Sequence, residues 1–104
     1  MNISRKKLAK KVDRANVRAA KYGVTDRLGM ADIDYMLSKC DGTCPYCGRK
    51  LVDPHLDHIV PLNRGGANTR HNIQLTCPDC NRMKSDMLEE EFFRQITRIF
   101  LTKN

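Results

Sequence analysis

The sequence predicts a small α+β fold in which a metal ion holds a short β-unit together between flanking helices. Two Cys-Pro-x-Cys segments, at 44–47 and 77–80, have the spacing of metal-binding turns. Short segments with strand character lie between them, and apolar residues recur at helical spacing near both ends of the chain. A chain of 104 residues builds only a modest core, which a bound metal would stabilise.

The N-terminal segment 1–24 is predicted to be a basic helical arm, followed by one domain at 25–104. Apolar residues recur at intervals of three and four, and Gly23 is expected to end the helix. Residues 1–22 hold eight basic residues against one acidic residue, whereas the rest of the chain is balanced. This charge favours attraction to nucleic acid, with a solvated helix face as the alternative. The apolar residues of the repeat are Leu8, Val12, Ala15 and Ala19.

A second helix is predicted within ADIDYMLSKCDG, with Ile33, Met36 and Leu37 facing inward and Gly42 at its end. Cys40 continues the same apolar stripe. It is therefore expected to be a buried free thiol and not a metal ligand.

The C-terminal segment DMLEEEFFRQITRIFLTKN has the clearest helical pattern. Asp86 and Glu89 are expected to form a capping box at its start. Its acidic residues lie near the N-terminal end and its basic residues near the C-terminal end, as the helix dipole favours. An apolar stripe is expected to pack against the core or a partner, and it contains Leu88, Phe92, Ile96 and Ile99, flanked by Phe93 and Phe100.

The two cysteine turns predict one structural zinc site. Two thiolates separated by two residues can occupy two corners of a tetrahedron, and two such turns complete the coordination of Zn²⁺. No coordination position is left for chemistry, so the ion is expected only to hold residues 48–76 by their two ends. The expected ligands are Cys44, Cys47, Cys77 and Cys80.

The segment between the turns is predicted to form strand, loop, strand and helix, as PHLDHIV, PLNRGGANTR, NIQLTC and PDCNRMKSD. Asp57 and His58 lie side by side at the end of the first strand, where a carboxylate and an imidazole would share one hollow. His55 is expected on the same face as Asp57 because side chains alternate along a strand. We expect His55 to fill the surface or the core, with a supporting contact to the site as the alternative.

These residues resemble the HNH endonuclease signature in its ββα-metal fold. The resemblance spans residues 40–86 and includes the Asp57-His58 pair, the Pro-Leu-x-x-Gly-Gly loop, Asn72 and the Cys-Asn-x-x-Lys ending. Asn81 stands where many members have histidine, which favours Mg²⁺ or Mn²⁺ as the catalytic ion. More loosely, the basic segment before KYGVTDRLG resembles the N-terminal part of small phage-type HNH proteins.

The resemblance implies a metal-dependent DNA endonuclease that leaves 5′-phosphate and 3′-hydroxyl ends. It implies that His58 is the general base, that Asp57 and Asn81 hold one divalent ion, and that Asn72 braces the loop or orients His58. The chemistry needs the same groups, because hydrolysis of a phosphodiester requires a base that is neutral near pH 7 and a cation at the phosphate.

Basic residues around the hollow and on the arm are expected to contact DNA phosphates. Such contacts position a protein without reading sequence, so low sequence specificity is expected. Gly65 and Gly66 are expected to form a turn, with a close approach to a phosphate as the alternative. For His71, the sequence leaves open a contact with the substrate or the metal. The expected DNA-binding residues are Arg64, Arg70, Arg82, Lys84, Lys6, Lys7, Lys10, Lys11 and Arg14.

Two other classes of protein share some of these features. A rubredoxin-like electron carrier would bind iron at the cysteine turns but would not need Asp57 and His58. A non-catalytic zinc module that binds DNA or a protein would need neither His58 nor Asn81.

No membrane segment or secretory signal is expected, which favours the cytoplasm, that of a bacterial host if the chain is phage-encoded. Phage packaging proteins are partners suggested by the resemblance, and the sequence leaves open monomer or dimer, and nicking or double-strand cleavage.

Overall fold

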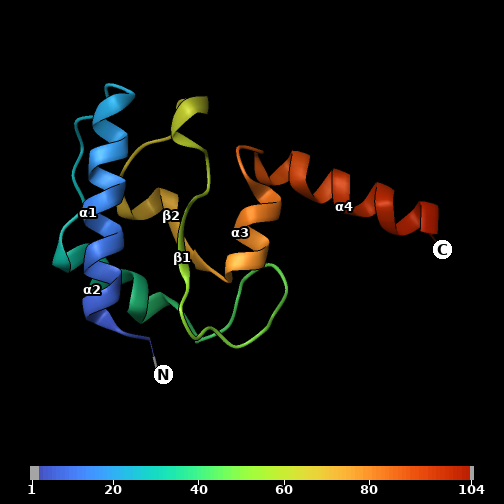
Figure 1. Ribbon diagram of the computed structural model, residues 1–104, viewed down its shortest axis with the longest axis horizontal. Coiled ribbons are helices and arrows are strands. Elements are labelled where there is room, and N and C mark those ends of the chain that lie inside the picture. The colour runs from blue at the N-terminus through green and yellow to red at the C-terminus, as the bar shows by residue number, and fades with distance from the viewer. Residues whose placement is uncertain (1–2, 104) are drawn as a thin grey trace.

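The computed structural model describes residues 3–103 and contains four α-helices around a two-stranded antiparallel sheet (Figure 1). The α+β class and the strand–strand–helix order predicted between the cysteine turns are both confirmed. None of the helices within this range combines the length and hydrophobicity that a membrane crossing requires. The elements are α1 (Arg5–Lys21), α2 (Met30–Lys39), β1 (His55–His58), β2 (Ile73–Thr76), α3 (Pro78–Lys84) and α4 (Glu89–Lys103), with 3₁₀ turns at Leu62–Arg64 and Arg70–Asn72.

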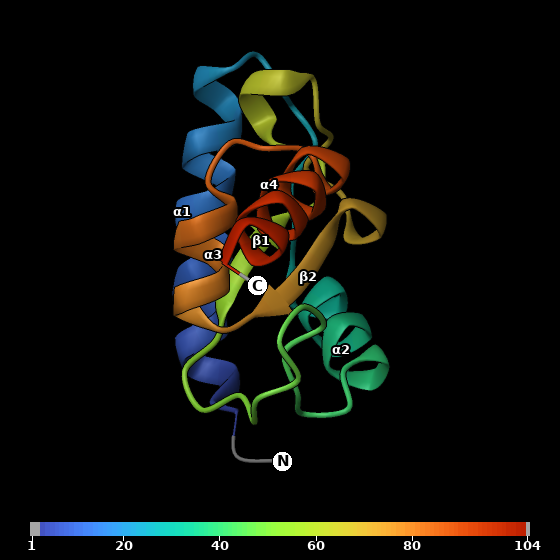
Figure 2. The same ribbon diagram turned by 90° about the vertical axis from the view of Figure 1, so that its right-hand side faces the viewer.

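The sheet places the predicted site residues and the cysteines at opposite ends of β2. His55 of β1 lies opposite Thr76 of β2, and His58 lies opposite Ile73, so the long loop begins and ends beside His58. Cys77 directly follows β2, at the other end of the strand. The chain then enters α3, which returns along β1 and brings its side chains back toward the loop end of the sheet (Figures 1 and 2).

Helix α1 forms as its apolar repeat predicts, and it contacts β1 and α2. The Ser4 hydroxyl caps the helix by accepting a hydrogen bond from the backbone N–H of Lys7. Gly23, at φ +74°, follows its end. The buried face of α1 belongs to the same core as the rest of the chain, so the division into arm and domain at residue 24 stays a prediction. The buried apolar residues of this face are Leu8, Val12, Ala15 and Ala19.

Helix α2 also forms and packs Ile33 and Met36 into the core as predicted, but it ends at Lys39, before the predicted end at Gly42. Cys40 directly follows its last residue and is only partly buried, so the expectation of a buried thiol is met in part. It lies outside the group of four cysteines described below, in agreement with its predicted free state.

Helix α4 begins at Glu89 and not at Asp86, so the predicted capping box is wrong. The carboxylate of Glu91 accepts a hydrogen bond from the backbone N–H of Leu88 and performs the capping role two residues later than predicted. Asp86 instead belongs to the turn after α3, where its carboxylate accepts a hydrogen bond from Asn63. The turn between α3 and α4 is therefore hydrogen-bonded to the loop between the strands.

Most of the apolar stripe of α4 remains uncovered. The helix leaves the body of the molecule at its N-terminal end and extends away from it, so that its C-terminus lies far from the sheet (Figure 1). Phe92 is buried and packs edge-to-face on Tyr46, which satisfies the predicted core contact at one position. The partner expected for the remainder of the stripe stays a prediction. The exposed apolar residues on α4 are Phe93, Ile96, Ile99, Phe100 and Leu101.

Candidate active site and metal centre

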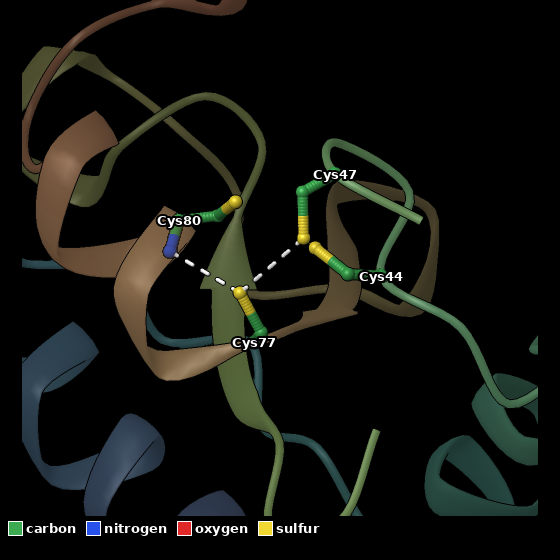
Figure 3. Close-up of side chains that lie close together, drawn as sticks. All are labelled: Cys44, Cys47, Cys77 and Cys80. Atoms are coloured by element: carbon green, nitrogen blue, oxygen red, sulfur yellow. Dashed lines mark hydrogen bonds between the residues drawn. The ribbon is translucent and has the colours of Figure 1, made fainter. Parts of the chain in front are cut away.

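The four predicted zinc ligands come together from the two cysteine turns, as Figure 3 shows. Their sulfur atoms all lie within 4.8 Å of one another. The Sγ atoms of Cys47 and Cys77 are 3.8 Å apart, which is about the sulfur–sulfur distance in a tetrahedron with Zn–S bonds of ~2.3 Å. The donor set is four thiols, the commonest composition of a structural zinc site. These residues therefore fit a metal such as zinc.

The surroundings shift the pKa values of two of these thiols in opposite directions. Burial raises the pKa of Cys44, but backbone N–H groups, that of Cys77 first, outweigh this effect and bring the pKa to about 7. Burial together with the neighbouring thiols raises the pKa of the Cys80 thiol. A metal ion binds cysteine as the thiolate, so its binding here would release the thiol protons that remain.

The metal centre also starts helix α3. Cys77 is the N-cap residue, and its sulfur accepts a hydrogen bond from the backbone N–H of Cys80 at 3.3 Å. Pro78 occupies the first helical position, where its fixed φ suits the helix and its missing N–H is not needed. A metal held here thus sets the position of α3, which carries Asn81 and Lys84.

Asp57, His58 and Asn81 line one hollow of about 320 Å³, as the sequence pattern predicts. Asp57 and His58 come from the end of β1, whereas Asn81 comes from α3. Unexpectedly, α1 also reaches this hollow. The further lining residues are Arg18, Tyr22, Leu56, Pro61, Leu62, Asn63, Ser85 and Asp86.

The carboxylate of Asp57 is held at both oxygens. Lys84 donates from Nζ to Oδ1 at 3.1 Å, and Gln74 donates from Nε2 to Oδ2 at 2.9 Å. The amide of Gln74 also donates to the hydroxyl of Tyr46 at 2.7 Å, which in turn donates to Glu89 at 2.8 Å. The buried carboxylate is therefore fixed by one hydrogen bond at each oxygen, and each oxygen keeps a further lone pair that these bonds do not use.

The placement of Lys84 corrects the prediction that it contacts DNA. Its side chain is 0% exposed, and its ammonium group donates to Asp57 and to the backbone carbonyl of His58. A buried ammonium group must be paired because removing a charge from water is costly. Lys84 thus holds the Asp57-His58 pair from within the protein and does not line the hollow.

Replacement of Lys84 by methionine is expected to destabilise the zinc-loaded protein by about 3–5 kcal/mol, because it leaves the Asp57 carboxylate buried without a counter-charge. Chemical denaturation followed by circular dichroism measures this loss. The double variant Lys84→Met, Asp57→Asn removes the lone charge and should recover part of the stability. Arg82→Met is the matched control, since Arg82 lies on the same helix and forms an exposed ion pair with Asp79. Equal effects of Lys84→Met and Arg82→Met would contradict the assigned role.

His58 is 6% exposed, and its Nε2 lies 2.9 Å from Oδ1 of Asn68. Burial lowers the pKa of the imidazole, an effect that the hydrogen bond to Asn68 opposes and the positive charge of Arg18 reinforces. His58 is therefore neutral near pH 7. A neutral imidazole can accept a proton, as the predicted general base requires.

Asn81 faces His55 across the strand–helix contact, with its Nδ2 at 3.0 Å from Nδ1 of that histidine. Burial and the positive charges of Lys11 and Arg82 lower the pKa of His55, so its neutral ring can accept this hydrogen bond. Within residues 3–103 the side-chain oxygen of Asn81 has no hydrogen-bond partner. His55 thus contacts the site through Asn81, which is the alternative role predicted for it, and the free amide oxygen is of the type that hard cations prefer.

Asn72 braces the loop between the strands. Its Oδ1 accepts the backbone N–H of Val60 at 2.9 Å, and its Nδ2 donates to the carbonyls of Val60 and Ala67. Gly66 lies so close to Val60 that a Cβ atom there would overlap the Val60 carbonyl oxygen. Asn72 has no contact with His58 among these bonds, so of its two predicted roles the structure is consistent with bracing of the loop.

The predicted DNA-binding arginines near the hollow each have a carboxylate partner. Arg64 pairs with Glu91 at 2.9 Å, Arg70 with Asp32 at 2.7 Å and Arg82 with Asp79 at 2.7 Å. None of the three lines the hollow itself. On α1, Lys11 pairs with Asp53 and also donates to the Pro54 carbonyl, whereas the other predicted cations are exposed, namely Lys6, Lys7, Lys10 and Arg14.

His71 is exposed and lies edge-on to the ring of Tyr35, with 5.7 Å between ring centroids. It does not line the hollow. This position favours a surface role over the alternative of a contact with the metal.

Four residues of the site escaped the sequence analysis: Arg18, Tyr22, Asn68 and Gln74. Arg18 lies on α1 and Tyr22 directly follows it, both more than thirty residues before β1, so no local spacing signals their approach. Gln74 sits one strand away from Asp57, at the position opposite it in the register, and a correct pairing of the two strands would have identified it. Asn68 had no signal of its own within a polar loop.

Comparison with known proteins identifies similarity in the region of the site. Residues 44–87 match the family model described as HNH endonuclease. The chain is also 34% identical over 56 residues to the type IV methyl-directed restriction enzyme EcoKMcrA of Escherichia coli (strain K12). The alignment covers 46% of this chain and 20% of that enzyme, so the chain spans only about a fifth of the length of its relative. The segment matched by the family model contains the four cysteines and the residues of the hollow that lie on β1, the loop and α3.

Proposed function

Residues 44–87 of this chain belong to the HNH endonuclease family, and on that premise we propose that the protein is a metal-dependent DNA endonuclease. The observation that carries the proposal is the convergence of Asp57, His58 and Asn81 on one hollow. A buried carboxylate, a neutral imidazole and a free amide oxygen there are the groups that hydrolysis of a phosphodiester requires.

In the proposed reaction, His58 accepts a proton from the attacking water. Asp57 and Asn81 would hold a divalent ion, and their all-oxygen donor set favours Mg²⁺ or Mn²⁺. When bound, such an ion would neutralise negative charge on the phosphate and on the leaving oxygen. Cleavage in this manner would leave 5′-phosphate and 3′-hydroxyl ends. Cys44, Cys47, Cys77 and Cys80 would bind a structural Zn²⁺.

We further propose that Arg18 contacts the phosphate that is cleaved. Arg18 is the one cationic side chain among the residues that line the hollow. Within residues 3–103 it has no carboxylate partner, in contrast to Arg64, Arg70 and Arg82. A guanidinium group without an internal partner can bind phosphate oxygens through two parallel hydrogen bonds. The basic residues of α1 would add affinity without sequence preference.

Cleavage of supercoiled plasmid by the zinc-loaded protein tests the proposed function. The assay compares Mg²⁺, Mn²⁺ and chelator, with methylated and unmethylated plasmid in parallel because the relative is described as methyl-directed. Cleavage that depends on added divalent ion supports the proposal, and the ratio of nicked to linear product shows whether one strand or both are cut. A protein that shifts plasmid on a gel yet leaves it intact under every condition would instead be a non-catalytic binding module.

Replacement of Arg18 by glutamine is expected to lower kcat/KM for plasmid cleavage by ~10²- to 10³-fold, the range associated with loss of one preorganised donor at the developing charge of a transition state. Arg14→Gln is the matched control, because Arg14 lies one turn earlier on the same helix, is exposed and does not line the hollow. The control should mainly change the salt dependence of binding. Equal losses in the two variants would show that Arg18 acts only through its positive charge, as any basic residue of α1 does, and would contradict a specific contact with the cleaved phosphate.

Three further expectations from the sequence stay predictions. These are action in the cytoplasm, where a bacterial DNA substrate lies, interaction with phage packaging proteins, and the oligomeric state. The nicked-to-linear ratio bears on the last of these, since double-strand cleavage requires two cutting events at one place.

A further inference from the structure

A buried chain of amide side chains links helix α1 to His58. Asn68, which is 0% exposed, donates from Nδ2 to Oδ1 of Asn16 at 2.8 Å and to the backbone carbonyl of Asp26 at 2.9 Å. Its own Oδ1 lies 2.9 Å from Nε2 of His58. Asn16 is itself buried on α1, the helix that lies along β1 in Figure 1. The chain thus connects the N-terminal helix with the proposed base.

Backbone groups determine the direction of every hydrogen bond in this series of side chains from Asn16 through Asn68 to His58. The N–H of Leu28 donates to Oδ1 of Asn16 at 2.8 Å, and the carbonyl of Leu28 accepts from Nδ2 of Asn16 at 3.0 Å. A backbone N–H can only donate and a carbonyl can only accept, so the amide of Asn16 has one orientation. Asn68 must then present its Nδ2 to two acceptors, Oδ1 of Asn16 and the Asp26 carbonyl. The oxygen of Asn68 is left to face His58.

An amide oxygen can only accept, so Nε2 of His58 must carry a proton. In the neutral imidazole the lone pair is then on Nδ1. Within residues 3–103, Nδ1 of His58 has no hydrogen-bond partner. The one buried side-chain nitrogen or oxygen without a partner in this range is Oγ1 of Thr76, so Nδ1 of His58 is open to solvent. His58 is also one of the residues that line the hollow.

We propose that Asn68, held in place by Asn16, is a positioning residue that sets the tautomer and ring orientation of His58. Nδ1 is then the atom that accepts the proton from the attacking water. This inference rests on the proposed function of His58 as the general base. It also assigns a role to α1 that its positive charge does not predict, since Asn16 lies outside the segment matched by the family model and still acts on the site.

The tautomer can be measured without any assay of activity. The zinc-loaded protein is labelled with ¹⁵N at histidine, and two-bond ¹H–¹⁵N spectra are recorded at about pH 8, above the usual histidine pKa of ~6.5. The signals of His58 are assigned by their absence in His58→Gln. We expect a protonated Nε2 and an unprotonated Nδ1. Wild-type protein with the proton of His58 on Nδ1 would overturn the inference.

Asn68→Ala is expected to show a mixture of the two tautomers at His58. Its kcat for plasmid cleavage should fall by ~10- to 100-fold, part of the contribution of a well-placed base, while KM changes little. Asn16→Ala leaves Asn68 with only the Asp26 carbonyl as acceptor and should lie between wild type and Asn68→Ala in both readouts. Met36→Ala is the control for general loss of stability, because Met36 is buried in the core and its side chain takes no part in these hydrogen bonds. It should leave the tautomer unchanged.

An unchanged tautomer and kcat in Asn68→Ala would overturn the inference. If Asn68→Ala does not fold, Asn16→Ala decides in its place, and wild-type values of both readouts in that variant would have the same consequence. A wild-type protein that holds its proton on Nε2 but cleaves no DNA would refute the proposed function and not the hydrogen-bond assignment. The two failures are therefore distinguishable.

Discussion

Replacement of His58 by alanine is expected to reduce plasmid cleavage by ~10²- to 10⁴-fold, the usual contribution of a general base. The substitution removes the only imidazole that lines the hollow in the described chain. The fold should persist, since the loss leaves one acceptor, Oδ1 of Asn68, without its donor at a cost of ~1–3 kcal/mol. Rates measured with saturating Mg²⁺ or Mn²⁺, beside circular dichroism spectra of both proteins, test this expectation.

His71→Ala provides the matched control for His58→Ala. His71 lies in the same inter-strand segment but is exposed and does not line the hollow. Its loss should leave the rate within about twofold of wild type, as is usual for an exposed side chain that contacts no substrate. His58→Gln is a second informative variant because its amide can still donate to Asn68 but cannot act as a base. If His58→Ala cuts as well as wild type after separate purifications, His58 is not the base.

Removal of the proposed structural zinc ion, or replacement of Cys77 by serine, is expected to unfold the protein at room temperature. Structural zinc sites contribute roughly 10–16 kcal/mol of binding free energy, which equals or exceeds the roughly 5–15 kcal/mol total stability of a small domain. Cys77 is buried, belongs to the four-thiol group and caps α3 through its sulfur. Its loss should therefore free α3, with Asn81 and Lys84, as well as the metal.

Cys40→Ser is the matched control, because Cys40 lies outside the four-thiol group. This variant should keep one zinc per chain and a thermal transition close to that of wild type. Atomic emission gives the metal content, and thermal denaturation with and without chelator gives the stability. Retention of both zinc and the thermal transition in Cys77→Ser would refute the metal centre. A coloured, redox-active metal would instead point to the iron-binding alternative.

Local spacing was sufficient to predict the elements that carry the site. The cysteine pairs predicted the metal centre because two cysteines separated by two residues lie in the same turn, where both sulfur atoms can reach one ion. The helical repeat predicted α1, with the same residues buried that the pattern selects. Alternation along 54–60 placed His55 and Asp57 on one face, and their contacts with Asn81 and with Lys84 on α3 agree with that placement. Each of these inferences depends on residues a few positions apart.

The start of α4 was mispredicted for a related reason. Asp86 and Glu89 have the spacing of a capping box. Leu88 and Glu91 have the same spacing, and they form the one bond of such a box that needs only the backbone N–H of the cap residue. Spacing does not distinguish between the two, because the choice depends on where the turn after α3 ends. The contact of Asp86 with Asn63 of the loop decided it.

The sequence by itself determined the four cysteines that come together, the order of elements and the identity of the groups at the hollow, because each of these follows from short-range spacing. Only the tertiary structure decided that Lys84 is buried behind Asp57, that Arg18 faces the hollow and that Asn16 and Asn68 hold His58. These roles join residues more than ten positions apart, and a lysine or an asparagine has the same local signature on the surface as in the interior. Burial and partners distinguish them, and both arise from the packing of α1 and α3 against the sheet.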